Sequence, residues 1–269
     1  MIVAVRGGSW LLALSVVGCG RSSGFSGFGD GELGETTDGA GTPVSRCAGA
    51  SEDVLGYWPL EGGVASDPIV DLGPLGNDGD RYRTEGVLDG RFGGAMRFDG
   101  NAEIVVDGDG LEPRRNVSMT AWVRPAQLDV EWNTVVSKGG ATDALDRYWL
   151  GYYDRGVRVH VSDGIDDTRV TDTADYGAHV GQWHHLAATY DGDTGRVAIY
   201  VDGRLTHAAP GAPTQLGYDG APLRIGMDTN WSVPGWGFVG DIDEVKLFGC
   251  TLDAGQVARD ATENWPWAD

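Results

Sequence analysis

Three tryptophan residues lie in polar segments where an aromatic ring can meet a ligand. Trp132, Trp231 and Trp236 have only Glu, Asn, Ser or Gly as direct neighbours in the chain. The face of an exposed indole beside such groups suits stacking on a sugar ring. The alternative is that the three rings fold back as plugs over the edge of the protein. Tryptophans in alternating apolar runs are instead expected in the core, namely Trp58, Trp122 and Trp183.

The histidine residues show no arrangement that is typical of a catalytic or metal site. His184 and His185 are adjacent, so alternation along a strand places them on opposite faces, and packing or surface roles are expected. His160, His179 and His207 have no metal-like spacing. A His-Glu-x-x-His pattern and a phosphate-binding loop are both missing from the sequence. These observations favour a protein that is not an enzyme.

The chain of 269 residues has a formal net charge of −20, with 40 acidic and 20 basic side chains. Nucleic-acid binding needs clustered Lys and Arg to contact phosphates, so this balance excludes nucleic acid as a partner. Adsorption to an anionic membrane surface is disfavoured for the same reason. An acidic surface is typical of a solvated exported protein, and it is also compatible with cation binding.

The first residues resemble the leader of a bacterial lipoprotein. Arg6 provides a positive charge, and residues 10–17 form an apolar stretch that is too short to span a bilayer as a helix. Because Val16-Val17-Gly18-Cys19 resembles a lipobox, residues 1–18 are predicted to be a signal peptide and Cys19 the lipidated residue. Ordinary cleavage, leaving Cys19 as a free thiol, is the alternative. The predicted location is the cell envelope, reached through the lipid anchor alone. The outer membrane is favoured because no Asp follows Cys19.

Lipidation of Cys19 leaves two cysteines, Cys47 and Cys250, in the mature chain. An even number of cysteines in an oxidising compartment favours one disulfide bond. Cys47 opens the predicted domain and Cys250 follows its last strong strand, and the two ends of a domain often lie close together. The sequence therefore predicts a Cys47–Cys250 disulfide, with two unpaired thiols as the alternative.

Two regions with different composition follow the leader. Residues 19–46 are rich in Gly, Ser, Thr and Asp and lack periodic apolar side chains, which predicts a disordered, flexible tether. From Val54 onward, short alternating runs recur at hairpin spacing, for example on both sides of residues 154–156. One helix is expected over residues 252–260, with Thr251 as its N-cap. The predicted fold is all-β, with two antiparallel sheets in a sandwich domain over residues 47–269.

Seven segments follow one another along the predicted sandwich, and together they resemble the laminin-G-like family of the concanavalin A-like lectin/glucanase superfamily. The resemblance implies a jelly-roll sandwich that often binds carbohydrate or protein and often holds one structural Ca²⁺ ion. It is specific for a fold and not for a function. The segments are Tyr57-Trp58-Pro59-Leu60, residues 71–79, residues 94–100, residues 118–123, residues 183–192, residues 199–203 and residues 240–248.

The residues at the matching positions include oxygen donors that suit the implied Ca²⁺ ion, which takes six to eight oxygen ligands. The predicted ligands are Asp71 and Asn77 around a Gly-rich turn, Asp99 in an Asp-Gly turn, and Asp243 inside an apolar run. The first three also suit a plain role as turn formers that bond their own backbone. Asp243 needs a partner or a metal, because a buried carboxylate loses its hydration.

The same fold also occurs in glycoside hydrolases, some of which place two catalytic Glu on one strand in a Glu-x-Asp-x-x-Glu pattern. Residues 241–246 have Asp241 in the first position and Lys246 in the last, so the acid/base carboxylate is missing. We therefore expect a surface-anchored module that binds a carbohydrate or a glycoprotein. A structural or protein–protein interaction domain without a glycan site is the alternative, and a hydrolase is the least favoured.

Overall fold

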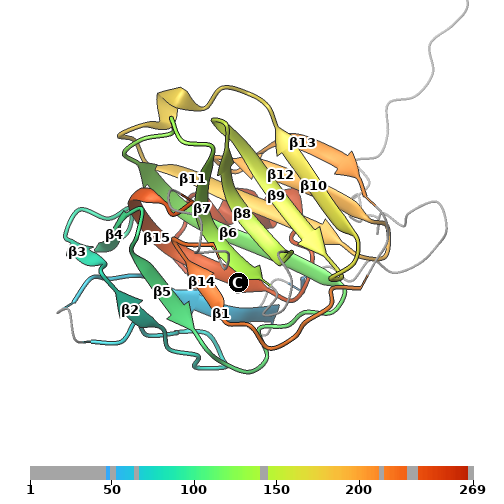
Figure 1. Ribbon diagram of the computed structural model, residues 1–269, viewed down its shortest axis with the longest axis horizontal. Helices are drawn as coiled ribbons and strands as arrows, with labels where there is room; N and C mark the ends of the chain where they lie inside the picture. Colours follow the sequence, from blue (N-terminus) through green and yellow to red (C-terminus); the bar gives the residue numbers. More distant parts are fainter. Residues whose placement is uncertain are drawn as a thin grey trace, which may run out of the picture.

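The computed structural model describes residues 47–48, 53–63, 67–139, 145–211, 215–228 and 236–265. Within these residues the chain forms two antiparallel β-sheets in a sandwich, with one short α-helix (Figure 1). The predicted all-β sandwich is therefore confirmed. The predicted signal peptide, the lipidation site at Cys19 and the tether lie outside the described residues. In the described part of the chain, no helix is long and apolar enough to cross a membrane.

The first sheet has eight strands in the order β13-β12-β11-β6-β15-β4-β3, and β1 also pairs with β15. Strand β4 pairs with the first part of β15 and β1 with its last part, so two strands share one side of β15. The strands are β1 (Val54–Trp58), β3 (Glu85–Val87), β4 (Ala95–Asp99), β6 (Asn116–Pro125), β11 (His184–Asp191), β12 (Arg196–Val201), β13 (Arg204–Pro210) and β15 (Val239–Phe248).

The second sheet has seven strands in the order β10-β9-β8-β7-β14-β5-β2. The chain passes from this sheet to the first one between β2 and β3, where Arg83 has a left-handed backbone with a φ of 60°. The strands are β2 (Asp80–Tyr82), β5 (Glu103–Val106), β7 (Trp132–Gly139), β8 (Asp146–Tyr153), β9 (Gly156–Ser162), β10 (Asp167–Asp172) and β14 (Leu223–Ile225).

Alternation along the strands builds the core between the two sheets. In β8, the side chains of Tyr148, Leu150 and Tyr152 join the central hydrophobic core and are fully buried. Their neighbours Trp149 and Tyr153 point to the opposite, outer face of the second sheet, because successive side chains of a strand alternate between faces. The same alternation therefore fills the core and equips the outer face with aromatic rings.

The tight turn between β8 and β9 confirms the hairpin predicted over residues 154–156. Asp154 and Arg155 both have positive φ angles, 47° and 68°. Two-residue turns of this kind fit the right-handed twist of antiparallel strands. The turn fixes the register in which Tyr153 pairs with Gly156.

Helix α1 (Ala254–Asp260) is the only α-helix in the described residues, and it begins two residues later than predicted. Its N-cap is Asp253 and not Thr251, so that prediction is wrong. The Asp253 side chain accepts a hydrogen bond from the backbone N–H of Gln256, and the Gln256 side chain accepts one from the N–H of Asp253. This reciprocal capping box satisfies two backbone donors, whereas the Thr251 hydroxyl donates to the Tyr190 carbonyl.

A disulfide bond joins Cys47 to Cys250 with a Cα–Cα distance of 5.1 Å, which confirms the predicted pairing. It lies in a second, smaller hydrophobic cluster on the outer face of the first sheet, under helix α1. The members of this cluster include Val54, Tyr57, Phe248, Leu252 and Val257. The bond thus connects the beginning of the described domain to the end of its last strand.

Candidate functional site

Aromatic rings gather on the outer face of the second sheet, where β7 begins and β8 ends. Trp132 and Tyr153 are cross-strand partners, with ring centroids 4.6 Å apart. The ring of Trp236, from the segment before β15, lies 5.3 Å from that of Trp132. Trp149 and His160 complete this group, at 5.6 Å from Trp132 in both cases. We call these five residues the aromatic cluster.

Burial divides the aromatic cluster into a floor and a rim. Trp149 is fully buried, and its indole N–H donates to the hydroxyl of Thr134 over 3.1 Å. His160 is also buried, with its ring 5.1 Å from that of Trp149. Trp132, Tyr153 and Trp236 are half-buried and form the rim. The rim rings therefore rest on a rigid floor and keep part of their surface open to solvent.

The imidazole of His160 stays uncharged at neutral pH. Its burial lowers the pKa of His160 to about 3, and the positive charges of Arg169 and Arg158 act in the same direction. Among the described residues, its Nε2 atom has no hydrogen-bond partner. A group with this pKa is unprotonated near pH 7, so His160 contributes an uncharged, flat ring to the floor.

Arg158 of β9 places a guanidinium group beside the rim. Its central carbon lies 3.2 Å from the centroid of the Tyr153 ring and 5.4 Å from that of Trp132. Its Nε donates to the hydroxyl of Thr171 over 2.7 Å, which fixes the side chain. The arrangement offers hydrogen-bond donors next to aromatic faces, which is the combination that binds the hydroxyl groups and the C–H face of a sugar.

The structure brings together two of the three tryptophans predicted to bind a ligand. Trp132 and Trp236 are neighbours in the rim, although Trp132 begins a strand and does not lie in a loop. Trp231 lies outside the described residues. Sequence reasoning missed Trp149, Tyr153, His160 and Arg158. The alternation of residues 147–153 and 157–161 carried the signal, because it sets these four side chains on the face opposite the core.

Two of the four predicted calcium ligands lie in one loop. The Asp71 carboxylate accepts hydrogen bonds from the backbone N–H groups of Tyr57, Gly73 and Asn77, at 2.8, 2.7 and 2.8 Å. The Asn77 side chain donates to the carbonyl of Asp109 over 2.9 Å. Asp71 thus holds the loop to β1, and three of about four lone pairs on its carboxylate are used.

The other two predicted ligands have different surroundings. Asp99 accepts a hydrogen bond from the backbone N–H of Asn101, as a turn former does. Asp243 accepts from the N–H groups of Arg91 and Phe92, at 2.7 and 3.1 Å. In the described part of the chain, the one group of three Cys, His, Asp or Glu side chains close enough for a metal contains both disulfide cysteines. The predicted ligand set is therefore not gathered at one point.

Lys246, at the last of the hydrolase-like positions of β15, belongs to a buried network of charged residues that includes Glu244. Glu244 accepts hydrogen bonds from the hydroxyl of Tyr57 at 2.9 Å and from Lys246 at 3.2 Å. Lys246 also lies 3.1 Å from Asp260 of helix α1, and His185 lies 3.0 Å from the same carboxylate. Solvent hardly reaches any of them, and their partners are one another. This network packs helix α1 onto the sheet and accounts for His185.

His184, on the opposite face of β11, has a separate environment. Its ring stacks on that of His179 with 3.5 Å between centroids, and its Nδ1 lies 2.9 Å from the carboxylate of Asp202. Burial lowers the pKa of His179 to about 4, and the neighbouring His184 adds to this shift. His184 and His185, which are adjacent in the chain, therefore make separate contacts on opposite faces of β11, in agreement with their predicted packing or surface roles.

Comparison with known proteins identifies the fold family. The model of the concanavalin A-like lectin/glucanases superfamily (Laminin_G_3) matches residues 98–258, which is more than half of the chain. The chain therefore belongs to this superfamily. No curated protein shows significant similarity to it. The family match agrees with the resemblance predicted from the sequence.

Solved structures share this fold at low sequence identity. Domain 4 of AbnA, a GH43 extracellular arabinanase from Geobacillus stearothermophilus in complex with arabinotriose, is 21% identical with a TM-score of 0.60, covering 78% of this chain and 98% of that one. The binding domain of Paraclostridial Mosquitocidal Protein 1 is 14% identical with a TM-score of 0.61, covering 78% and 52%. The botulinum neurotoxin DC binding domain, in complex with rat synaptotagmin II, is 10% identical with a TM-score of 0.56, covering 77% and 51%. The chain thus spans about half the length of the two toxin domains.

Proposed function

We propose that this protein is a non-catalytic module that binds carbohydrate through its aromatic cluster. The half-buried rings of Trp132, Tyr153 and Trp236 carry the proposal, because they form a supported aromatic surface with the guanidinium of Arg158 beside it. Sugar rings bind to such surfaces through their C–H faces, while a few fixed polar groups orient their hydroxyls. The arabinotriose complex of the AbnA domain supports the proposal by analogy of fold.

The proposal places this module on the cell surface. The lipobox-like segment that ends in Cys19 and the polar stretch of residues 19–46 support a lipid-anchored module on a tether. The net charge of −20 supports a solvated position away from an anionic membrane surface. In this arrangement, the module attaches the cell to an extracellular glycan or glycoprotein.

Glycan-array binding followed by calorimetry tests the function. We expect the Trp132→Ala, Trp236→Ala double variant to lose about tenfold or more in affinity, because each ring contributes about 1 kcal/mol beyond its buried area. Tyr82→Ala is the matched control, because it removes an exposed ring from β2 at the far edge of the same sheet. Trp132→Phe keeps a ring and should retain most of the affinity. Binding that is indifferent to both tryptophans would contradict the proposal.

A protein-binding module is the second candidate, and an exposed apolar loop favours it. Val70, Leu72 and Leu75 are 50%, 60% and 44% exposed, and Asp71 fixes the loop between them by its three backbone contacts. Rigid, exposed apolar groups are typical of protein interaction sites. A Leu72→Ser, Leu75→Ser variant that loses a protein partner and keeps its glycan affinity would favour this candidate.

A structural Ca²⁺ ion stays a prediction of the family resemblance. If the ion binds, the melting temperature rises with added Ca²⁺ and falls with a chelator, since binding to the folded state alone stabilises it. Asp71→Asn should then reduce the calcium-dependent part of the shift. An unchanged melting temperature, together with no metal in elemental analysis, removes the ion from the proposal.

A further inference from the structure

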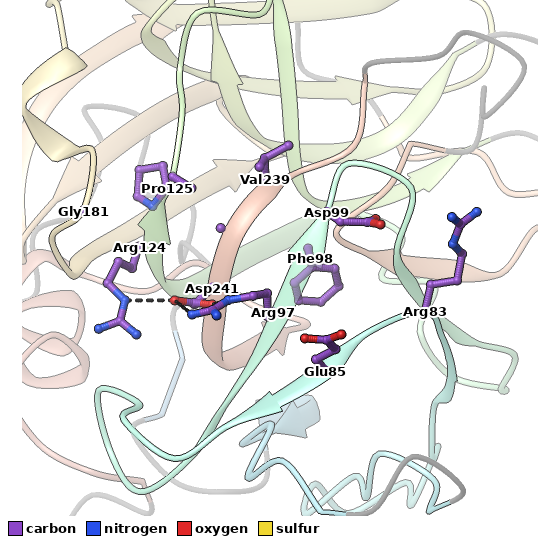
Figure 2. A pocket seen from close by; sticks show the side chains of 12 residues that line it. Arg83, Glu85, Arg97, Phe98, Asp99, Arg124, Pro125, Gly181, Val239 and Asp241 are labelled. Carbon is purple, nitrogen blue, oxygen red and sulfur yellow. Dashed lines mark hydrogen bonds and ion pairs between the residues drawn. The ribbon is translucent and has the colours of Figure 1, made fainter.

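A pocket with several charged side chains in its lining opens at one end of the sandwich, on the outer side of the first sheet (Figure 2). Its volume is about 540 Å³, which is within the range of small-ligand sites. Strands β3, β4, β6 and β15 provide most of its walls. Three arginines and three carboxylates line it, namely Arg83, Glu85, Arg97, Asp99, Arg124 and Asp241. We call it the arginine pocket.

Asp241 fixes two of the three guanidinium groups. One of its carboxylate oxygens accepts from Nε of Arg97 at 2.8 Å, and the other accepts from Nη2 of Arg97 at 3.2 Å and from Nε of Arg124 at 2.9 Å. The Asp241 side chain is 6% exposed, whereas that of Arg97 is 53% exposed. A buried carboxylate thus orients two arginines at the pocket wall, and Arg97 keeps surface for a ligand.

Arg124 is further restrained from two sides. Its Nη1 and Nη2 atoms lie 3.1 Å from the carboxylate and the carbonyl oxygen of Asp89, respectively. Its guanidinium lies 4.8 Å from the ring centroid of Trp183, which is half-buried although it was predicted to be core. Groups that are held in place before binding lose little side-chain entropy on binding.

The opposite side of the pocket carries Arg83 and Asp99, with Glu85 below them (Figure 2). All three side chains are exposed. One side of the pocket thus carries Arg97, Arg124 and Asp241, and the other carries Arg83, Glu85 and Asp99. Each side offers hydrogen-bond donors and acceptors, and the formal charges of the whole lining cancel. Such a lining suits a neutral polyhydroxyl ligand, because each hydroxyl both donates and accepts a hydrogen bond.

The positive charges of this pocket are guanidinium groups, as are nearly all basic side chains of this protein. The sequence has only two lysines, Lys138 and Lys246, and both are buried. A guanidinium presents a planar set of five donors in fixed directions, whereas an ammonium is a compact point charge. The exposed cations of this protein are thus suited to directional hydrogen bonds.

Two glycines with positive φ angles line the pocket. Gly240 has a φ of 145°, and a Cβ at this position would lie 2.4 Å from the carbonyl of Arg124. Gly181 is exposed with a φ of 80°, and a Cβ there would meet no atom within 4 Å. At Gly240 the pocket wall is therefore main chain without a side chain. At Gly181 the space beside the main chain is unfilled.

A short segment links the arginine pocket to the aromatic cluster. Trp236 belongs to the cluster, Gly237 forms a bridge to Thr134 in the second sheet, and Val239 lines the pocket at the start of β15. Val239 is three positions after Trp236, so their Cα atoms are at most about 11 Å apart. The cluster lies on the outer face of the second sheet and the pocket on the outer side of the first, so this segment connects the two sites from one sheet to the other.

We propose that the arginine pocket is a second subsite for the same glycan, and that it takes neutral sugar units beyond those stacked on the aromatic cluster. This inference rests on the proposed function. A chain long enough to pass around the sandwich along residues 236–239 contacts both places, and a shorter one contacts the rings alone. The hydroxyls of the distal units accept from Arg83 and Arg97 and donate to Glu85 and Asp99.

Chain-length dependence of binding tests the pocket. Calorimetry measures neutral arabino-, xylo- and cello-oligosaccharides, from disaccharides to hexasaccharides, with the wild type, Arg83→Ala and Ala126→Leu. Both substitutions are at exposed positions lining the pocket, so folding should be unaffected. We expect each to lower the affinity for the longest chains about tenfold and to leave the shortest unchanged. Arg83→Ala removes a charged hydrogen-bond donor, and Ala126→Leu fills part of the pocket.

Arg204→Ala and Ala174→Leu are the matched controls, because both positions are exposed and neither lines the pocket. Equal affinity of wild type, Arg83→Ala and Ala126→Leu for every length overturns the pocket and leaves the aromatic cluster intact. Tighter binding of oligogalacturonides, with a preference that falls as salt rises, overturns the neutral class in favour of an anion site. If the wild type binds no neutral oligosaccharide, both the proposed function and the subsite fail.

Discussion

Asp243 shows how a single residue can couple the stability of this protein to pH. Its side chain is fully buried, and burial raises its pKa to about 7. The N–H groups of Phe92 and Arg91 oppose this rise, while the charge of the adjacent Glu244 adds to it. The folded state therefore holds a proton on Asp243 between its ordinary pKa of 3.8 and about 7, where the unfolded chain has lost it.

The raised pKa of Asp243 predicts how the stability of the protein changes with pH. Stability from Asp243 is fully present below pH 3.8 and is lost as the pH rises to about 7, because the folded state binds the proton more tightly. Asn cannot ionise and keeps one oxygen for the same N–H donors. Urea unfolding at pH 5 and pH 8 should show Asp243→Asn gaining on the wild type between the two pH values, by at most about 3 kcal/mol. A constant difference between the two proteins would contradict the raised pKa.

Helix α1 shows the same dependence on buried charge at the scale of an element. Seven residues are too few for a stable isolated helix, so contacts with the sheet must hold it. Asp260 provides these contacts through Lys246 and His185. Burial alone would raise the pKa of Asp260, but the charge of Lys246 and the His185 hydrogen bond outweigh it and lower the pKa.

Removing the Asp260 side chain should therefore weaken the packing of helix α1 against the first sheet. Asp260→Ala leaves the buried Lys246 with Glu244 as its remaining carboxylate partner. The free energy of unfolding should fall by about 3–5 kcal/mol. Glu263→Ala, at an exposed position after the helix, is the control and should change it by less than about 0.5 kcal/mol. Chemical denaturation of the three proteins measures this difference, and equal midpoints for both variants would show that the network does not hold α1.

The strands were predictable because alternation records which face is buried, and segments such as residues 157–161 confirm it. The helix start was not, because the choice between Thr251 and Asp253 depends on the reciprocal bond with Gln256. The aromatic cluster was predictable only in part. Trp132 and Trp236 stood out by their polar neighbours, whereas Trp149 is buried on an outer face, and burial there depends on residues distant in the sequence.

At the scale of the whole molecule, the Cys47–Cys250 disulfide closes a loop with a sequence separation of 203 residues. A cross-link of this length removes much of the freedom of the unfolded chain, about 5 kcal/mol in the chain-entropy model. We expect a reductant, or the Cys47→Ser, Cys250→Ser variant, to lower the free energy of unfolding by up to this amount. Thermal melts with and without reductant measure the effect. The variant itself should then be insensitive to reductant.

The burial of both lysines has a practical consequence for anyone who handles this protein. Amine-directed reagents, including common biotin esters and cross-linkers, meet no exposed lysine side chain while the described domain is folded. A protease that cleaves after lysine likewise reaches its sites only when the chain opens around Lys138 or Lys246. Cleavage at these two positions therefore reports, without any label, how often the fold opens around Lys138 or Lys246, whether locally or by global unfolding.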